Sequence, residues 1–70
     1  MELKDVKKVA ESKQLVKYDG IKYIVIAYIL RLIDGKWKQQ VELKDLKAKS
    51  SVRSAEIKDV EVLEGEFYGQ

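Results

Sequence analysis

The side chains available for acid–base chemistry in this sequence are carboxylates, because the chain contains no His and no Cys. Asp19, Asp34, Glu42 and Asp45 are the candidates, and catalysis by a carboxylate pair needs two of them held together. Asp19 and Asp34 each precede a Gly, however, and Asp in an Asp-Gly pair suits the geometry of a turn. A Ser-His-Asp triad and a Cys/His zinc site are both excluded. We therefore expect no enzyme activity.

Motifs for phosphate or metal binding are also missing. The four Gly residues are isolated from one another, so the sequence has no Gly-rich phosphate loop, and it has no D-x-D-x-D-G calcium loop. The carboxylates of residues 61–66 would hold Ca²⁺ only loosely, and we interpret them as a solvated acidic segment. The sequence predicts neither a cofactor nor a metal site.

The charge pattern admits a nucleic-acid partner. Residues 1–55 carry 13 basic and 7 acidic side chains, whereas residues 56–70 carry 1 basic and 5 acidic side chains. Small barrels bind single strands by pairing a basic groove with stacking aromatics. The candidate nucleic-acid face consists of Lys36, Lys38, Lys44, Lys47, Lys49 and Arg53. The candidate interaction aromatics are Tyr18, Tyr23 and Tyr28, for which the competing interpretation is a place in the core.

The elements that would position these side chains are mostly strands. Apolar residues spaced by three and four predict a short helix over residues 3–13, capped by Asp5 and docked on the rest, with a frayed arm as the alternative. Two Asp-Gly pairs between apolar runs predict tight hairpin turns and a three-stranded meander. A fourth strand over residues 51–55, a single helical turn and a short fifth strand follow.

This order of elements is the one found in SH3-like barrels. We therefore predict a mainly β fold, a small SH3-like five-stranded antiparallel barrel with a short N-terminal helix. The predicted organisation is a helix or arm over residues 1–14, the barrel over residues 15–63 and a flexible acidic tail over residues 64–70.

The middle strand is apolar on both faces between residues 23 and 30, so both faces need cover. A bend that serves two sheets, the N-terminal helix or self-association would each supply it. Trp37 shares a strand face with Val41 and Leu43, which favours a place in the core. Arg31 interrupts the apolar strand, and we expect it to pair with a neighbouring carboxylate. The predicted core consists of Val16, Ile24, Val25, Ile26, Ala27, Ile29, Leu30, Trp37, Val41, Leu43, Val52, Val60 and Val62.

Several short motifs carry a resemblance to a known group of proteins. These motifs are Tyr18-Asp19-Gly20, Ala27-Tyr28-Ile29-Leu30-Arg31, Trp37, Val41 to Ala48, Ser51-Val52 and Asp59-Val60-Glu61. Over about residues 15–62 the chain resembles small uncharacterised proteins carried by conjugative transposons and related mobile elements of Gram-positive bacteria. That group has no established activity, so the resemblance implies an accessory role in a mobile element and a cytoplasmic setting, and no functional residue is transferred.

Two classes of binding function remain open. A small barrel offers an aromatic-rimmed groove and a sheet edge to a protein partner, which favours a non-catalytic protein–protein interaction module, with a homodimer as one form of it. A weak, salt-sensitive nucleic-acid module that uses the Lys-rich face is the alternative. Twelve Lys against two Arg make that alternative the weaker one, because Arg suits phosphate recognition better. The first residues lack the apolar stretch of a signal peptide and the longest apolar run is too short to span a bilayer, so we expect a cytoplasmic protein without membrane contact.

Overall fold

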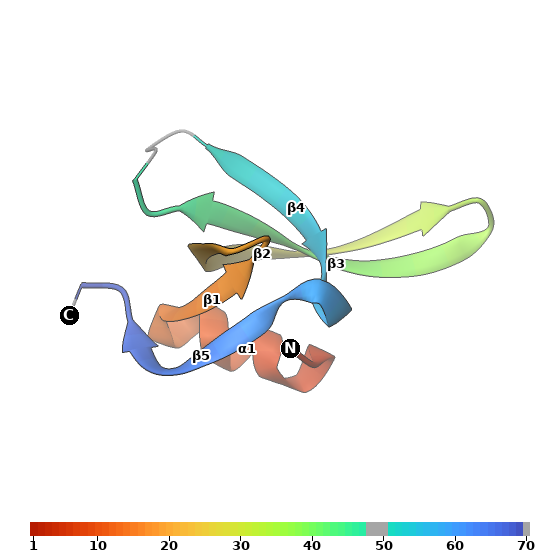
Figure 1. The fold of residues 1–70 in the computed structure, drawn as a ribbon. Helices are drawn as coiled ribbons and strands as arrows, with labels where there is room; N and C mark the ends of the chain where they lie inside the picture. Colours follow the sequence, from red (N-terminus) through yellow and green to blue (C-terminus); the bar gives the residue numbers. More distant parts are fainter. Residues whose placement is uncertain (48–50, 70) are drawn as a thin grey trace.

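The computed structural model describes residues 1–47 and 51–69. In chain order the elements are α1 (Leu3–Ser12), β1 (Gln14–Tyr18), β2 (Ile21–Ile33), β3 (Lys36–Asp45), β4 (Val52–Glu56), the 3₁₀ turn η1 (Ile57–Asp59) and β5 (Glu61–Phe67) (Figure 1). The five strands form one sheet in the order β4-β3-β2-β1-β5, and all neighbours are antiparallel. The mainly β class and the N-terminal helix are confirmed. The predicted barrel is not, because within the described residues no pairing joins β4 to β5.

Both Asp-Gly pairs form the tight turns that the sequence predicts. Asp19 and Gly20 have φ values of 54° and 76°, and Asp34 and Gly35 have φ values of 50° and 76°. Two consecutive residues with positive φ are the geometry of a type I′ turn, whose twist matches that of the flanking strands. Asp and Gly tolerate this conformation better than other residues do. The turns therefore fix the register of β1 on β2 and of β2 on β3.

The N-terminal helix docks on the sheet. Glu2, and not Asp5 as predicted, is the N-cap residue of α1; Asp5 lies in the first turn and accepts a hydrogen bond from the backbone N–H of Glu2 at 3.3 Å. Val6 and Val9, spaced by three residues, are buried in the core. The ammonium group of Met1 donates to the Val60 carbonyl oxygen at 2.6 Å. Within the described residues no helix has the length and the apolar content needed to cross a membrane.

The core lies between α1, η1 and one face of the sheet. Its fully buried side chains are Tyr23, Leu43, Val16 and Val41, and Ile57 of η1 and Val60 pack with them. On β3, Val41 and Leu43 lie two residues apart and so point to the same face. We call the side of the sheet that carries them the core side.

A bulge changes which residues of β2 face the core side. Val25 pairs with Leu43 and Ala27 pairs with Glu42, so two steps along β2 match one step along β3 and Ile26 is the extra residue. Before the bulge, the odd-numbered residues of β2 face the core side. After it the even-numbered ones do, because Tyr28 lies opposite Val41. The bulge accounts for the change of the core-side residues from odd to even numbers along this strand.

The predicted core is correct in part. Val16, Val25, Val41, Leu43 and Val60 are buried as predicted. Ile24, Ala27, Ile29 and Val62 are half-buried. The prediction is wrong for Ile26, Leu30, Trp37 and Val52, which are exposed. Ile26 is the bulge residue, Val52 begins the edge strand β4, and the other two lie on a part of the hairpin that no other element covers.

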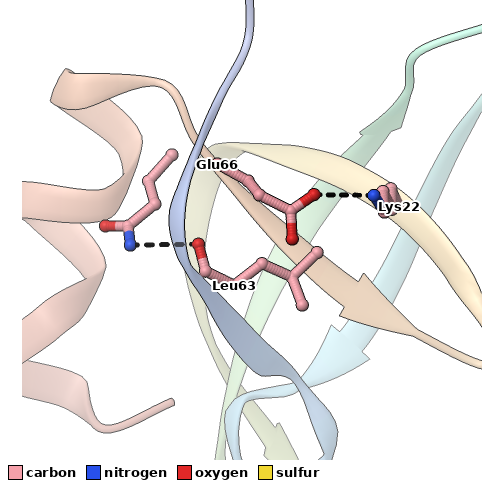
Figure 2. Close-up of polar contacts among 4 residues, drawn as sticks. Lys22, Leu63 and Glu66 are labelled. Carbon is pink, nitrogen blue, oxygen red and sulfur yellow. Dashed lines mark hydrogen bonds and ion pairs between the residues drawn. The ribbon is translucent and has the colours of Figure 1, made fainter.

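Strand β5 extends the sheet beyond the boundary at residue 63 that the sequence predicted. It runs to Phe67, which pairs with Gln14 of β1. The Gln14 side-chain amide donates to the Leu63 carbonyl oxygen at 3.3 Å, and Lys22 Nζ lies 2.6 Å from Glu66 Oε1 (Figure 2). Residues 64–67, predicted as part of a flexible tail, are therefore strand, because their backbone and side chains have partners on β1 and β2.

Candidate interaction surface

The hairpin of β2 and β3 extends past every other strand. The last rung that β4 shares with it is Gln40 opposite Glu56, and β1 pairs no further than Tyr23. The ladder of the hairpin continues alone from Leu30 opposite Gln39 to Ile33 opposite Lys36. Figure 1 shows this end projecting away from the helix and the other strands, and the chain measures 41 Å in its longest direction. We call residues 30–39 the arm.

The core side of the arm and its base is apolar and exposed. Leu32 lies directly opposite Trp37, and Leu30 and Tyr28 follow at steps of two along β2. These four side chains form one face, which we call the arm face, and all of them are exposed. Monomeric proteins rarely leave a contiguous apolar patch of this kind open unless a partner uses it. The arm face is therefore the strongest candidate interaction surface in the described parts of the chain.

An open groove of about 890 Å³ lies at the foot of the arm face. Leu3 of α1, Ile57 of η1 and Leu30 and Trp37 of the arm line it. The charged side chains around it have both signs and are Glu2, Lys4, Lys38, Glu56 and Lys58. Glu56 lies 3.2 Å from Lys58 and 3.9 Å from Lys38, so this rim is partly neutralised. The groove has the shape and apolar lining for an inserted side chain, and it has no arrangement of groups for catalysis.

The predicted basic face divides into separate parts. Lys36 and Lys38 lie on the arm, whereas Lys44 and Lys47 lie at the other end of β3 and beyond it. Lys44 lies six positions along β3 from Lys38, which is roughly 20 Å. Lys49 lies outside the described residues. The structure therefore brings no more than two of the predicted lysines to one end of the sheet.

Arg53 is engaged by other residues of the chain. Its Nη1 donates to the Tyr23 hydroxyl at 3.1 Å, its guanidinium lies 4.9 Å above the Tyr18 ring, and Asp19 Oδ2 is 3.6 Å away. The hydrogen bond to Tyr23 raises the pKa of Arg53 above its ordinary value, and the nearby charge of Asp19 raises it further. Desolvation lowers this pKa by a smaller amount. Two candidate aromatics and one candidate cation thus contact one another.

This cluster gives a prediction for Tyr23. Replacing it by Phe removes only the hydroxyl that Arg53 contacts, and because Arg53 is partly exposed, water replaces the lost partner. We expect Tyr23→Phe to lower the free energy of unfolding by about 0.5–1 kcal/mol, measured by urea denaturation. Tyr28→Phe is the control, since the Tyr28 side chain is exposed, and it should leave the midpoint unchanged. Equal midpoints for the two variants would contradict a role for the cluster in stability.

The structure places the other predicted site residues in different environments. Tyr23 is buried and so is closed to a ligand, Tyr18 is half-buried under Arg53, and Tyr28 is exposed on the arm face. Arg31 lies opposite Lys38, a like charge, and has no ion pair within the described residues, so the salt bridge expected for it is not confirmed. In residues 1–47 and 51–69 no group of three acidic side chains is placed to hold a metal ion.

Sequence reasoning missed Leu30, Leu32 and Trp37 as surface residues. A usable indication was present in the turn spacing, because the strand between the two Asp-Gly turns is thirteen residues long and its neighbour β1 has five. The end of a strand that extends past its neighbouring strands is left without an adjacent strand on that side. Comparison of the chain with protein families, curated proteins and solved structures finds no match.

Proposed function

We propose that the chain is a non-catalytic protein-binding module that presents the arm face to its partner. The observation that supports this most directly is the exposure of Trp37, together with Leu30 and Leu32, on a projection of the sheet. Trp is among the residues that dominate binding energy in protein interfaces. An apolar projection beside an apolar groove is suited to partners that bury it.

The finer fold assignment is part of the same proposal. The strand order and the 3₁₀ turn between β4 and β5 are those of SH3-like barrels, which supports a relation to that fold in an open form. This argument is an analogy of fold and names no ligand. An accessory role in a mobile element and a cytoplasmic setting complete the proposal, and both are based on the resemblance and the sequence alone.

Site-specific photo-cross-linking tests the module in cells that naturally carry the chain. A benzoylphenylalanine in place of Trp37 should form adducts with protein, because this position is exposed on the arm face. The same replacement at Val52, an exposed residue of β4 outside the arm, is the control and should form few adducts. The mass of each adduct identifies the partner as another protein or a second copy. An absence of protein adducts at Trp37, or equal yields at both positions, would refute the proposal.

Nucleic-acid binding is the second candidate, favoured by one feature. Arg31 and Lys38 lie opposite each other on the side of the arm away from the arm face, and Lys36 follows two residues from Lys38. If this side bound single strands, oligonucleotide affinity would fall steeply with salt and fall again in Lys36→Gln and Lys38→Gln. If the chain is a protein-binding module, dye-labelled forms of these oligonucleotides show no rise in fluorescence anisotropy when the chain is added at low salt.

A further inference from the structure

The arm has the properties of a surface that a chain presents to a copy of itself. Between Tyr28 and Leu32 on β2, and between Trp37 and Val41 on β3, the residues on the core side carry no formal charge. A two-fold contact places like residues near one another, so a charge on this face would meet its own copy. The basic residues of the arm lie on its other side, where a face-to-face contact leaves them in water.

The exposed area comes close to what such a contact needs. Trp37 is 63% exposed, Leu32 58%, Leu30 50%, Leu3 49% and Tyr28 41%. With about 200–280 Å² for each whole residue, these fractions leave on the order of 600 Å² of exposed surface on one copy. A standard specific interface removes roughly 800 Å² from each partner. The arm face and the walls of the adjoining groove together approach that value.

A two-stranded ribbon also gains from being covered. An isolated hairpin is marginally stable in water, and three or more strands or a packed layer are needed for independent stability. The arm has neither, because β4 and β1 end before it. A second arm laid across the arm face supplies the missing layer for both copies at once.

We propose that two copies of this chain pack arm face against arm face about a two-fold axis close to Leu30. This inference rests on the proposed function, since it names the partner of the same surface. The two-fold axis sets the tip of one arm on the base of the other. Trp37 of each copy then enters the groove of the other between α1 and η1. The groove and the arm face are thereby used together.

Sedimentation velocity on the full-length chain tests this arrangement. A species of twice 8.1 kDa is expected, in equilibrium with monomer on dilution. Trp37 is the only Trp, so its emission should shift to shorter wavelength as the concentration rises and the indole leaves water. Leu30→Lys and Leu30→Glu should each weaken dimerisation at least 100-fold, because each puts two like charges at the axis. Val52→Lys, the same change on an exposed residue outside the arm, should leave it intact. Far-UV circular dichroism checks that each variant is folded.

An equal mixture of Leu30→Lys and Leu30→Glu gives the sharpest result. Opposite charges then meet at the axis, and the dimer should return in the mixture although neither variant forms it alone. A full-length chain that stays at 8.1 kDa at every concentration, a dimer that Leu30→Lys does not weaken, or no recovery in the mixture would each overturn the proposal. Monomers in solution together with Trp37 adducts to a different protein would overturn the proposed dimer and leave the proposed function in place. Monomers without any adduct would overturn the proposed function as well.

Discussion

Leu43→Ala is expected to remove a large part of the free energy of unfolding of the chain. Leu43 is 0% exposed at the centre of the core, so the change removes buried methyl groups and leaves a cavity. Such changes cost about 2–5 kcal/mol, and a domain of this length has a total stability on the order of 5 kcal/mol. Urea denaturation followed by circular dichroism measures the loss.

The neighbouring strand offers a matched control for this change. Leu32→Ala makes the same chemical change on an exposed residue of the arm face, and it should shift the urea midpoint little when measured at concentrations where the chain is monomeric. If both variants were equally stable, the assignment of Leu43 to the core and of Leu32 to the surface would be incorrect.

Val9→Asp is expected to undock α1 from the sheet. Val9 is 2% exposed among apolar neighbours, and a carboxylate there has no partner and loses its water. We expect a loss of about 3–4 kcal/mol in the free energy of unfolding, accompanied by loss of helical circular dichroism. A short helix of this kind does not persist without packing, so undocking and unwinding should occur together.

Lys8→Asp controls for the helix propensity of the new residue. It lies one position away on the exposed face of the same helix and introduces the same side chain. Its midpoint should stay close to that of the unchanged chain. Similar losses in the two variants would show that the helix responds to Asp itself and not to the burial of Val9.

The turns and the three-stranded meander were predictable because their determinants are local. Asp34 and Gly35 suit positive φ values, and an Asp-Gly pair between two strand-forming segments is a strong local signal for a hairpin. The helix was predictable for a similar reason, since the spacing of Val6 and Val9 already defines its buried side.

The extent of the core was not predictable by the same means. Trp37 does share a face with Val41 and Leu43, as the alternation indicates, but the face continues beyond the elements that cover it. Strand alternation indicates to which side of the sheet a side chain points. It does not indicate how far along the strand other elements cover that side. The bulge at Ile26 is a second limit, because one extra residue exchanges the two sides of the strand for everything that follows it.

The candidate site was only partly visible for this reason. Tyr28 was among the predicted interaction residues, whereas Tyr23 was assigned to the same set and is buried. Both are Tyr residues on the same strand, and the register shift between them puts both on the core side of the sheet. Their environments differ because the other elements cover Tyr23 and leave Tyr28 exposed. Lys36 and Lys38 were correctly placed on a strand. Lys44 lies at the far end of the same strand, and the residue composition alone does not give the distance between them.

The pairing of β1 with β5 determines the order in which strand pairs form as the chain is synthesised. Residues of β1 such as Gln14 pair with residues such as Phe67, which a ribosome adds much later. At ordinary rates of translation the interval between completion of β1 and completion of β5 is about 3–10 s. The local hairpin of β2 and β3 closes within microseconds once its residues are free. Until β5 is in place, a folding chain has a hairpin next to an unpaired β1 edge, and an unpaired edge is where a strand of another copy can pair.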